Sequence, residues 1–147
     1  MVCLGNICRS PMAHGILQKK VAELKLDWEV DSAGTSAYHQ GEAPDSRAIE
    51  TAAAHDIDIT GQKSRQLVQM DVSNYDLIIT MDTNNYNNTL KLATNEAEKA
   101  KVKLLLNYSH PKENRAVPDP YYSGGFDYVY GLIEEAVTAM VNDIKRN

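Results

Sequence analysis

The chain has 147 residues, of which 43% are hydrophobic and 24% charged, so one folded domain covering residues 1–147 is expected and a disordered chain is excluded. The net charge of −5 argues against nucleic-acid binding, and two cysteines with four scattered histidines supply neither a disulfide framework nor a metal site, so no metal or cofactor is expected. No apolar run is long enough to cross a membrane and no secretion signal is visible, so we expect a cytoplasmic protein with no membrane partner.

The first half of the chain predicts a helix, a strand and a second helix. The first helix is expected to begin at Ser10-Pro11, because serine is a good N-cap and proline is favoured at the first helical position. Residues 28–32 predict a strand, and the loop after it contains Gly34 and Gly41. Asp45 is expected to cap a helix that runs to about residue 55.

The second half predicts two buried strands and a long final helix. Residues 76–81 and 102–106 predict the strands, and Asp82 is expected to cap the helix between them. Residues 107–125 predict a long loop, and such loops are often functional. An apolar stripe then predicts a helix that packs on the core, formed by Phe126, Val129, Tyr130, Ile133, Val137, Met140, Val141 and Ile144.

Strands and helices alternate along the chain, so the sequence predicts an α/β fold with a parallel sheet. In such sheets ligands bind at the carboxyl ends of the strands. The chemistry is therefore expected in the loops that follow the strands.

The loop before the first helix carries the clearest chemical signal, the stretch CLGNICRS at residues 3–10. A thiol ionises near neutral pH when it lies beside a helix N-terminus or a cation, so Cys3 is the candidate nucleophile. Amides that point inward at the positive end of a helix can hold phosphate, and Gly5 and Asn6 can adopt the unusual backbone angles that this requires. Arg9 adds a planar fork for two phosphate oxygens, and the Ser10 hydroxyl can hydrogen-bond the thiolate.

The motif C-x-G-N-x-C-R-S-P strongly resembles the phosphate-binding loop (P-loop) of the low-molecular-weight protein tyrosine phosphatases. The resemblance covers nearly the whole chain and includes Ser32-Ala33-Gly34-Thr35, Asp45-Ser46-Arg47, Ser64-Arg65-Gln66-Leu67, Tyr75-Asp76-Leu77-Ile78, Met81-Asp82 and Asp119-Pro120-Tyr121-Tyr122. It implies a three-layer fold, in which a four-stranded parallel sheet has helices on both faces.

The resemblance also implies a metal-independent hydrolase that cleaves phosphotyrosine proteins or aryl phosphates through a phosphocysteine intermediate. Cys3, Arg9 and Asp119 are then the catalytic residues, with Asp119 as the general acid and base. The binding residues are Leu4, Gly5, Asn6, Ile7, Cys8 and Ser10 of the loop, with Tyr38, Tyr121 and Tyr122 as the walls of a deep slot. Free phosphate and other oxyanions are expected to bind the same loop.

The first strand departs from the pattern of the family. Only Met1 and Val2 precede Cys3, so the strand is expected to be truncated, with a start site upstream of Met1 as the hypothesis. A shortened central strand would weaken both the sheet and the base of the loop.

Several residues have plainer alternatives. Cys8 either pairs with Cys3 on oxidation, as in the family, or is a packed thiol. Asp119 could be only a turn residue, and Asp127, the nearest rival acid, is expected to begin the last helix. The four histidines are expected to have no catalytic role. Arg47 and Arg65 are expected in ion pairs, with Arg47 near the rim of the slot as an alternative.

Three other functions share parts of this sequence pattern. An arsenate reductase of this fold needs further cysteines, and the chain has only Cys3 and Cys8. A protein arginine phosphatase tends to carry threonine where this chain has Ile7, and alters the aromatic pair after Asp119-Pro120. A catalytically silent phosphate-binding module is disfavoured because Cys3, Arg9 and Asp119 are all present. A monomer is expected, with weak self-association through the aromatic slot as an alternative.

Overall fold

The computed structural model describes all 147 residues and has a four-stranded parallel sheet with the strand order β2-β1-β3-β4. The strands are β1 (Val2–Cys3), β2 (Ala33–Gly34), β3 (Ile78–Thr80) and β4 (Val102–Leu104). The helices are α1 (Arg9–Glu23), α2 (Ser46–Ala53), α3 (Gln69–Asn74), α4 (Thr83–Leu90), α5 (Glu96–Lys99), α6 (Pro120–Ser123) and α7 (Phe126–Arg146), with a 3-10 turn η1 (Leu105–Asn107). The predicted α/β fold is confirmed.

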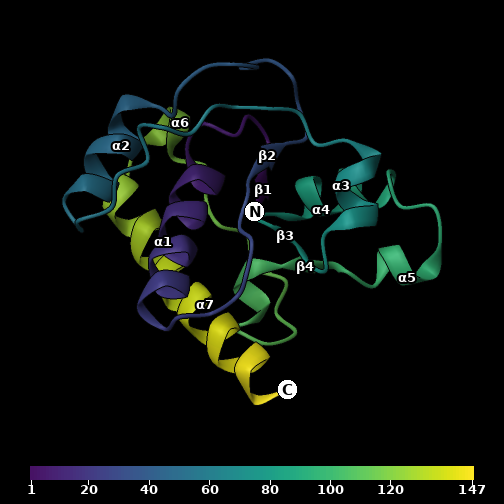
Figure 1. Ribbon diagram of the computed structural model, residues 1–147. Coiled ribbons are helices and arrows are strands. Elements are labelled where there is room, and N and C mark those ends of the chain that lie inside the picture. Colours follow the sequence, from purple (N-terminus) through teal and green to yellow (C-terminus); the bar gives the residue numbers. More distant parts are fainter.

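Helices cover both faces of the sheet, as expected. Helices α1, α2 and α7 pack against one another on one side, and α3, α4 and α5 lie on the other (Figure 1). Neighbouring residues of one strand point to opposite faces. In β1, Cys3 therefore joins the larger core under α1 and α7, and Val2 joins the smaller core on the α4 side. None of the helices has both the length and the apolar character that crossing a bilayer requires.

The short strand β1 lies at the centre of the sheet. Val2 pairs with Ala33 on one side and with Thr80 on the other. The ladder extends one residue further back, where the Met1 ammonium donates to the carbonyl oxygen of Asp31 at 3.0 Å. Burial lowers the pKa of this ammonium to about 6.

The strand predicted at residues 28–32 is wrong, because the second strand is Ala33–Gly34 and residues 28–32 have no regular structure. The physical reason is that a strand needs a partner strand, and the pairing with β1 begins at Ala33. Before Ala33, only Met1 is available as a hydrogen-bond partner from β1's end of the chain. The other strands lie within their predicted ranges but are shorter. The caps predicted at Asp45 and Asp82 are confirmed, with hydrogen bonds of 2.8 Å from the amides of Arg47 and Asn85.

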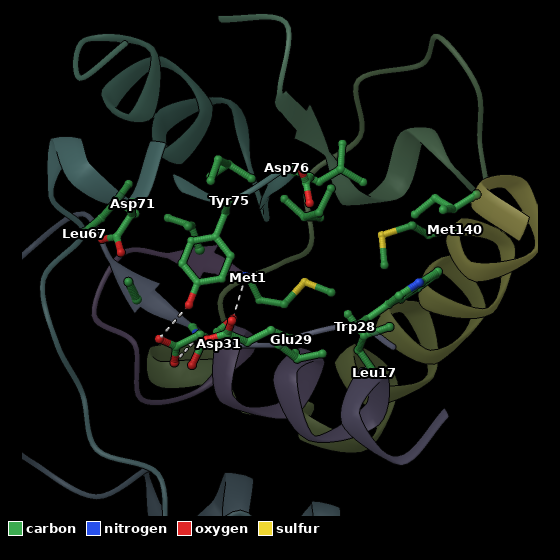
Figure 2. Close-up of a pocket in the computed structure, with 18 of the residues that line it drawn as sticks. Met1, Leu17, Trp28, Glu29, Asp31, Leu67, Asp71, Tyr75, Asp76 and Met140 are labelled. Atoms are coloured by element: carbon green, nitrogen blue, oxygen red, sulfur yellow. Dashed lines mark hydrogen bonds between the residues drawn. The ribbon is translucent and has the colours of Figure 1, made fainter. Parts of the chain in front are cut away.

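An apolar cavity of about 250 Å³ lies at the amino end of the sheet, at the end of β1 opposite to the predicted loop. Met1, Trp28, Tyr75 and Met140 point into it from four parts of the chain, and Asp31 lies beside Met1 (Figure 2). The cavity contains none of the predicted site residues.

Candidate active site

The loop of residues 3–10 joins β1 to α1, so Cys3 ends the central strand and Arg9 begins the helix. Asn6 has a φ of 56°, a left-handed conformation that asparagine adopts more readily than most residues. This turn brings the Asn6 backbone amide to 3.3 Å from the Cys3 sulfur. The loop thus curls around the thiol and supplies it with a hydrogen-bond donor.

Ser10 lies inside the first helical turn, and its hydroxyl oxygen is 3.1 Å from Cys3 Sγ. The helix N-cap is Cys8 rather than Ser10, so the prediction that Ser10 caps the helix is wrong. The reason is that the hydroxyl is already engaged, with Cys3 on one side and the side-chain amide of Asn6 on the other, at 2.7 Å. Its placement fits the other predicted role, that of hydrogen-bonding the thiolate.

The side chain of Arg9 is buried, with 3% of its surface exposed, and polar partners surround its guanidinium group. Its Nη1 donates to Asp82 Oδ2 at 2.7 Å and to the carbonyl oxygen of Val117 at 2.9 Å. Its Nη2 lies 3.5 Å from Asp119 Oδ2. A buried guanidinium needs paired charge and hydrogen bonds, and both are present here. The guanidinium is therefore oriented before any ligand arrives.

A buried hydrogen-bond chain supports the loop from behind. Asn6 Nδ2 donates to Ser32 Oγ at 3.1 Å, and Ser32 Oγ lies 3.0 Å from His14 Nδ1. Asn6 Oδ1 accepts from the Arg65 backbone amide at 3.1 Å. Burial lowers the pKa of His14, with the N-terminal ammonium as a second cause, so the ring is held neutral. This contact was not predicted from the sequence, because it joins His14 to Ser32, which lies in a distant segment of the chain.

Asp119 is the N-cap of α6, and its Oδ1 accepts from the Tyr121 amide at 3.1 Å. The predicted loop of residues 107–125 therefore contains a short helix, because an aspartate followed by proline is a strong helix start. Asp127 lies in the first turn of α7, as expected, and does not line the pocket that contains Asp119.

One pocket of about 440 Å³ brings the predicted residues together. Its walls are Cys3, Leu4, Gly5, Ile7, Cys8, Arg9, Ser36, Tyr38, His39, Asp119, Tyr121 and Tyr122. The predicted residues Asn6 and Ser10 do not line it, and instead bond the loop and the thiol from beneath. Ser36 and His39 line it without having been predicted.

The rim of the pocket is aromatic. Tyr38 and Tyr122 are 86% and 89% exposed, and Tyr121 is partly covered. Between them stands His39, whose ring centroid is 4.9 Å from that of Tyr38 and 6.1 Å from that of Tyr121. His39 Nδ1 lies 2.7 Å from Glu42 Oε2, which fixes the ring. The sequence could have indicated that His39 lies at this rim, because His39 directly follows the predicted wall residue Tyr38.

The two cysteines have different environments although both are free. Burial, with Asp45 and Cys3 as further causes, raises the pKa of Cys8 to about 12. Cys8 therefore stays a protonated thiol at neutral pH and is a poor nucleophile. Their pairing on oxidation stays a prediction.

The pocket combines a thiol, a fixed guanidinium and a carboxylate, arranged around space open to solvent. No group of three or more His, Cys, Asp or Glu side chains is placed to hold a metal ion. A guanidinium fork with loop amides suits a tetrahedral oxyanion, and a thiolate beneath it can attack the central atom. Asp119 lines the same pocket as Cys3 and Arg9.

Known proteins that are similar to this chain are named as phosphatases. The model of the family described as low molecular weight phosphotyrosine protein phosphatase matches residues 1–147. A putative low molecular weight protein-tyrosine-phosphatase of Synechocystis is 41% identical over 139 residues, which are 92% of this chain and 88% of that protein. The crystal structure of YfkJ from Bacillus subtilis superposes with a TM-score of 0.92 at 35% identity, covering 99% of this chain and 92% of the other. A structure of a Drosophila arginine phosphatase gives a TM-score of 0.90 at 33% identity, covering 98% and 95%.

Proposed function

This chain belongs to the low molecular weight phosphotyrosine protein phosphatases, a family of hydrolases, and we propose that it cleaves phosphotyrosine through a phosphocysteine intermediate on Cys3. The observation that carries the proposal is that Cys3, Arg9 and Asp119 line one pocket, with Ser10 Oγ 3.1 Å from the sulfur. No other thiol of the chain can serve, because the pKa of Cys8 is raised to about 12.

The first step transfers the phosphoryl group to sulfur. The Cys3 thiolate attacks phosphorus while the Arg9 fork and the loop amides bind the equatorial oxygens. The bond between phosphorus and the phenolic oxygen breaks, and protonated Asp119 gives its proton to that oxygen. The products of this step are a neutral phenol, a phosphocysteine and an Asp119 carboxylate.

The second step returns the enzyme to its starting state. The Asp119 carboxylate accepts a proton from water as the water oxygen attacks phosphorus. The sulfur–phosphorus bond breaks, which releases inorganic phosphate and regenerates the thiolate. The Ser10 hydroxyl stabilises that thiolate as it leaves, since a hydrogen bond to a charged group is stronger than one to a neutral group.

The aromatic rim supports an aryl substrate. Tyr38, Tyr121 and Tyr122 form walls against which a flat ring can stack. The thiol lies at the buried floor of the pocket, so a phosphate must be carried on a long side chain to reach it. Phosphotyrosine meets this requirement, and phosphoserine is too short.

A second substrate class is worth testing because one structural neighbour is named as an arginine phosphatase. Ile7 lines the pocket together with Tyr121 and Tyr122, and this combination favours phosphotyrosine over phosphoarginine. Arsenate reduction lacks the additional cysteines that it needs. A monomeric state and a cytoplasmic location stay predictions.

The deciding experiment measures phosphate release from matched peptides that carry phosphotyrosine, phosphoserine or phosphoarginine. The variants are Cys3→Ser and Asp119→Asn, with Cys8→Ser as the control for loss of a thiol. We expect cleavage of phosphotyrosine alone, no turnover by Cys3→Ser, and a loss of roughly 10²–10⁴-fold for Asp119→Asn. Faster cleavage of phosphoarginine would reassign the substrate, and inactivity of the unaltered chain towards every peptide would favour a phosphate-binding module.

A further inference from the structure

Arg47, in the first turn of α2, connects the phosphate-binding loop to the segment that carries Asp119. Its Nε and Nη2 each donate to the Asp45 carboxylate at 3.0 Å, and Nη2 also donates to the carbonyl oxygen of Tyr121 at 3.1 Å. Its guanidinium carbon lies 4.7 Å from the centre of the Phe126 ring and 5.8 Å from that of Tyr121. One planar side chain thus contacts α2, α6 and the start of α7.

Both ends of this connection reach the catalytic residues. On one side, the Asp45 backbone amide donates to the carbonyl oxygen of Ile7, in the phosphate-binding loop, at 2.8 Å. On the other side, the Tyr121 amide donates to Asp119 Oδ1 while its carbonyl oxygen accepts from Arg47. We call the series Ile7–Asp45–Arg47–Tyr121–Asp119 the acid strap.

The segment that carries Asp119 has few other attachments. In residues 118–124, one hydrogen bond comes from a distant part of the chain, and it is the bond from Arg47 to Tyr121. The other hydrogen bonds of these residues are local to α6. Gly124 and Gly125 follow with φ values of 75° and 76°, conformations that glycine adopts readily and other residues rarely adopt. The ion pair between Asp119 and Arg9 is long, at 3.5 Å. Val117, two residues before Asp119, is held by bonds to Met81 and Arg9. Arg47 is therefore the attachment that holds the segment on the other side of Asp119.

We propose that Arg47 is a positioning residue for the general acid Asp119, acting through the Tyr121 peptide and without touching the phosphate. The inference rests on the proposed function, since it assigns a role within that reaction. A lysine cannot replace it, because one ammonium cannot match the two oxygens of Asp45 and stack on Phe126 as the planar fork does. A displacement of about 1 Å in a catalytic group can cost roughly 100-fold in rate.

The test compares leaving groups, because only a poor leaving group needs the acid. Values of kcat/KM are measured with phenyl phosphate and with a nitrophenyl phosphate, whose phenolate departs without protonation; this parameter reports the step that releases the phenol. The variants are Arg47→Ala, Arg47→Lys and Asp119→Asn, alone and combined. The control is Arg115→Ala, which removes an exposed ion pair with Glu113 on the same long segment.

We expect Arg47→Ala to lower kcat/KM by roughly 10- to 100-fold for phenyl phosphate and by less than about threefold for the nitrophenyl ester. Arg47→Lys should also lower kcat/KM for phenyl phosphate more than for the nitrophenyl ester. Arg115→Ala should have the same kcat/KM values as the unaltered chain. Added to Asp119→Asn, Arg47→Ala should cost little more, since the two act as a unit.

Equal losses on both esters, or losses that multiply with those of Asp119→Asn, would overturn the proposal and assign Arg47 to substrate binding. Thermal unfolding checks that each variant is folded, and Arg47, 46% exposed, contributes little to global stability. If the unaltered chain cleaves neither ester, the proposed function itself fails. That outcome is distinct from failure of the positioning role proposed for Arg47.

Discussion

The side-chain amide of Asn6 donates a 2.7 Å hydrogen bond to the hydroxyl of Ser10, and this bond fixes where the hydroxyl proton points. The Arg65 backbone amide can only donate, so the atom of Asn6 that faces it is the oxygen, and the NH₂ group faces Ser10 and Ser32. Because Ser10 accepts from Asn6, its own proton is free to be donated to Cys3 Sγ. The loop is thus arranged to stabilise a thiolate.

Replacing Ser10 by alanine removes one donor from the thiolate. We expect Ser10→Ala to slow hydrolysis of the phosphocysteine by roughly 10- to 100-fold, the cost of a lost hydrogen bond to a charged group. Rapid-quench kinetics should show a burst of phenol equal to the enzyme concentration, followed by slow turnover. Ser109→Ala, far from the thiol, is the control, and the absence of a burst in Ser10→Ala would contradict the assignment.

Alkylation should distinguish the two cysteines. With the pKa of Cys8 raised to about 12, this thiol stays protonated up to strongly alkaline pH and reacts slowly. Iodoacetamide at neutral pH should modify Cys3 first, and inorganic phosphate should protect it. Peptide mass mapping over time gives the rates, and equal labelling of Cys8 would mean that its environment is more polar than described.

A methyl group at Gly34 should deform the phosphate-binding loop. A Cβ there would lie 2.7 Å from the carbonyl oxygen of Leu4 and 3.1 Å from the Asn6 nitrogen, which are backbone atoms that cannot rotate away. We expect Gly34→Ala to cost about 1–3 kcal/mol of stability and to weaken phosphate binding.

Gly131→Ala, where a Cβ meets nothing within 4 Å, should instead stabilise α7 by about 0.5–1 kcal/mol. Chemical denaturation and phosphate titration measure both effects.

Acid should destabilise the fold partly through His14. Its pKa in the folded state is lowered by burial, so below its ordinary value of 6.5 the unfolded chain takes up a proton that the folded chain does not. Stability should therefore fall as the pH falls through 6.5 and below. The Met1 ammonium, with its pKa lowered to about 6, adds a loss of the same sign between pH 8 and 6, moderated by Asp31.

His14→Gln separates these two contributions. Glutamine can accept the Ser32 bond but does not titrate, so the variant should lose less stability than the unaltered chain between pH 6.5 and 5. His110→Gln is the matched control, and unfolding free energies across this pH range are the measurement. Parallel curves for His14→Gln and the unaltered chain would show that His14 is protonated without cost.

The sequence predicted which residues share the pocket better than it predicted the helices and strands around them. Cys3, Arg9 and Ser10 are neighbours in the chain, so their spacing and the helix start largely determine how they meet. The strand at 28–32 was wrong because strand pairing depends on a distant segment, β1, which begins to pair at Ala33. His39 was missed because its role depends on Glu42 and Tyr121. Contacts between distant segments leave little trace in a single sequence.

The nucleophile and the acid differ in how they are attached to the fold. Cys3 pairs with Gly34 in the central ladder and belongs to the main core, so it can move only in a cooperative opening of the whole sheet. Asp119 belongs to a segment with few hydrogen bonds to the rest of the chain, so we expect this segment to open locally at a smaller free-energy cost. Amide hydrogen exchange should therefore be slowest along β1 and fast in α6. Warming should first abolish proton transfer to the leaving group, while Cys3 can still be alkylated in a folded chain.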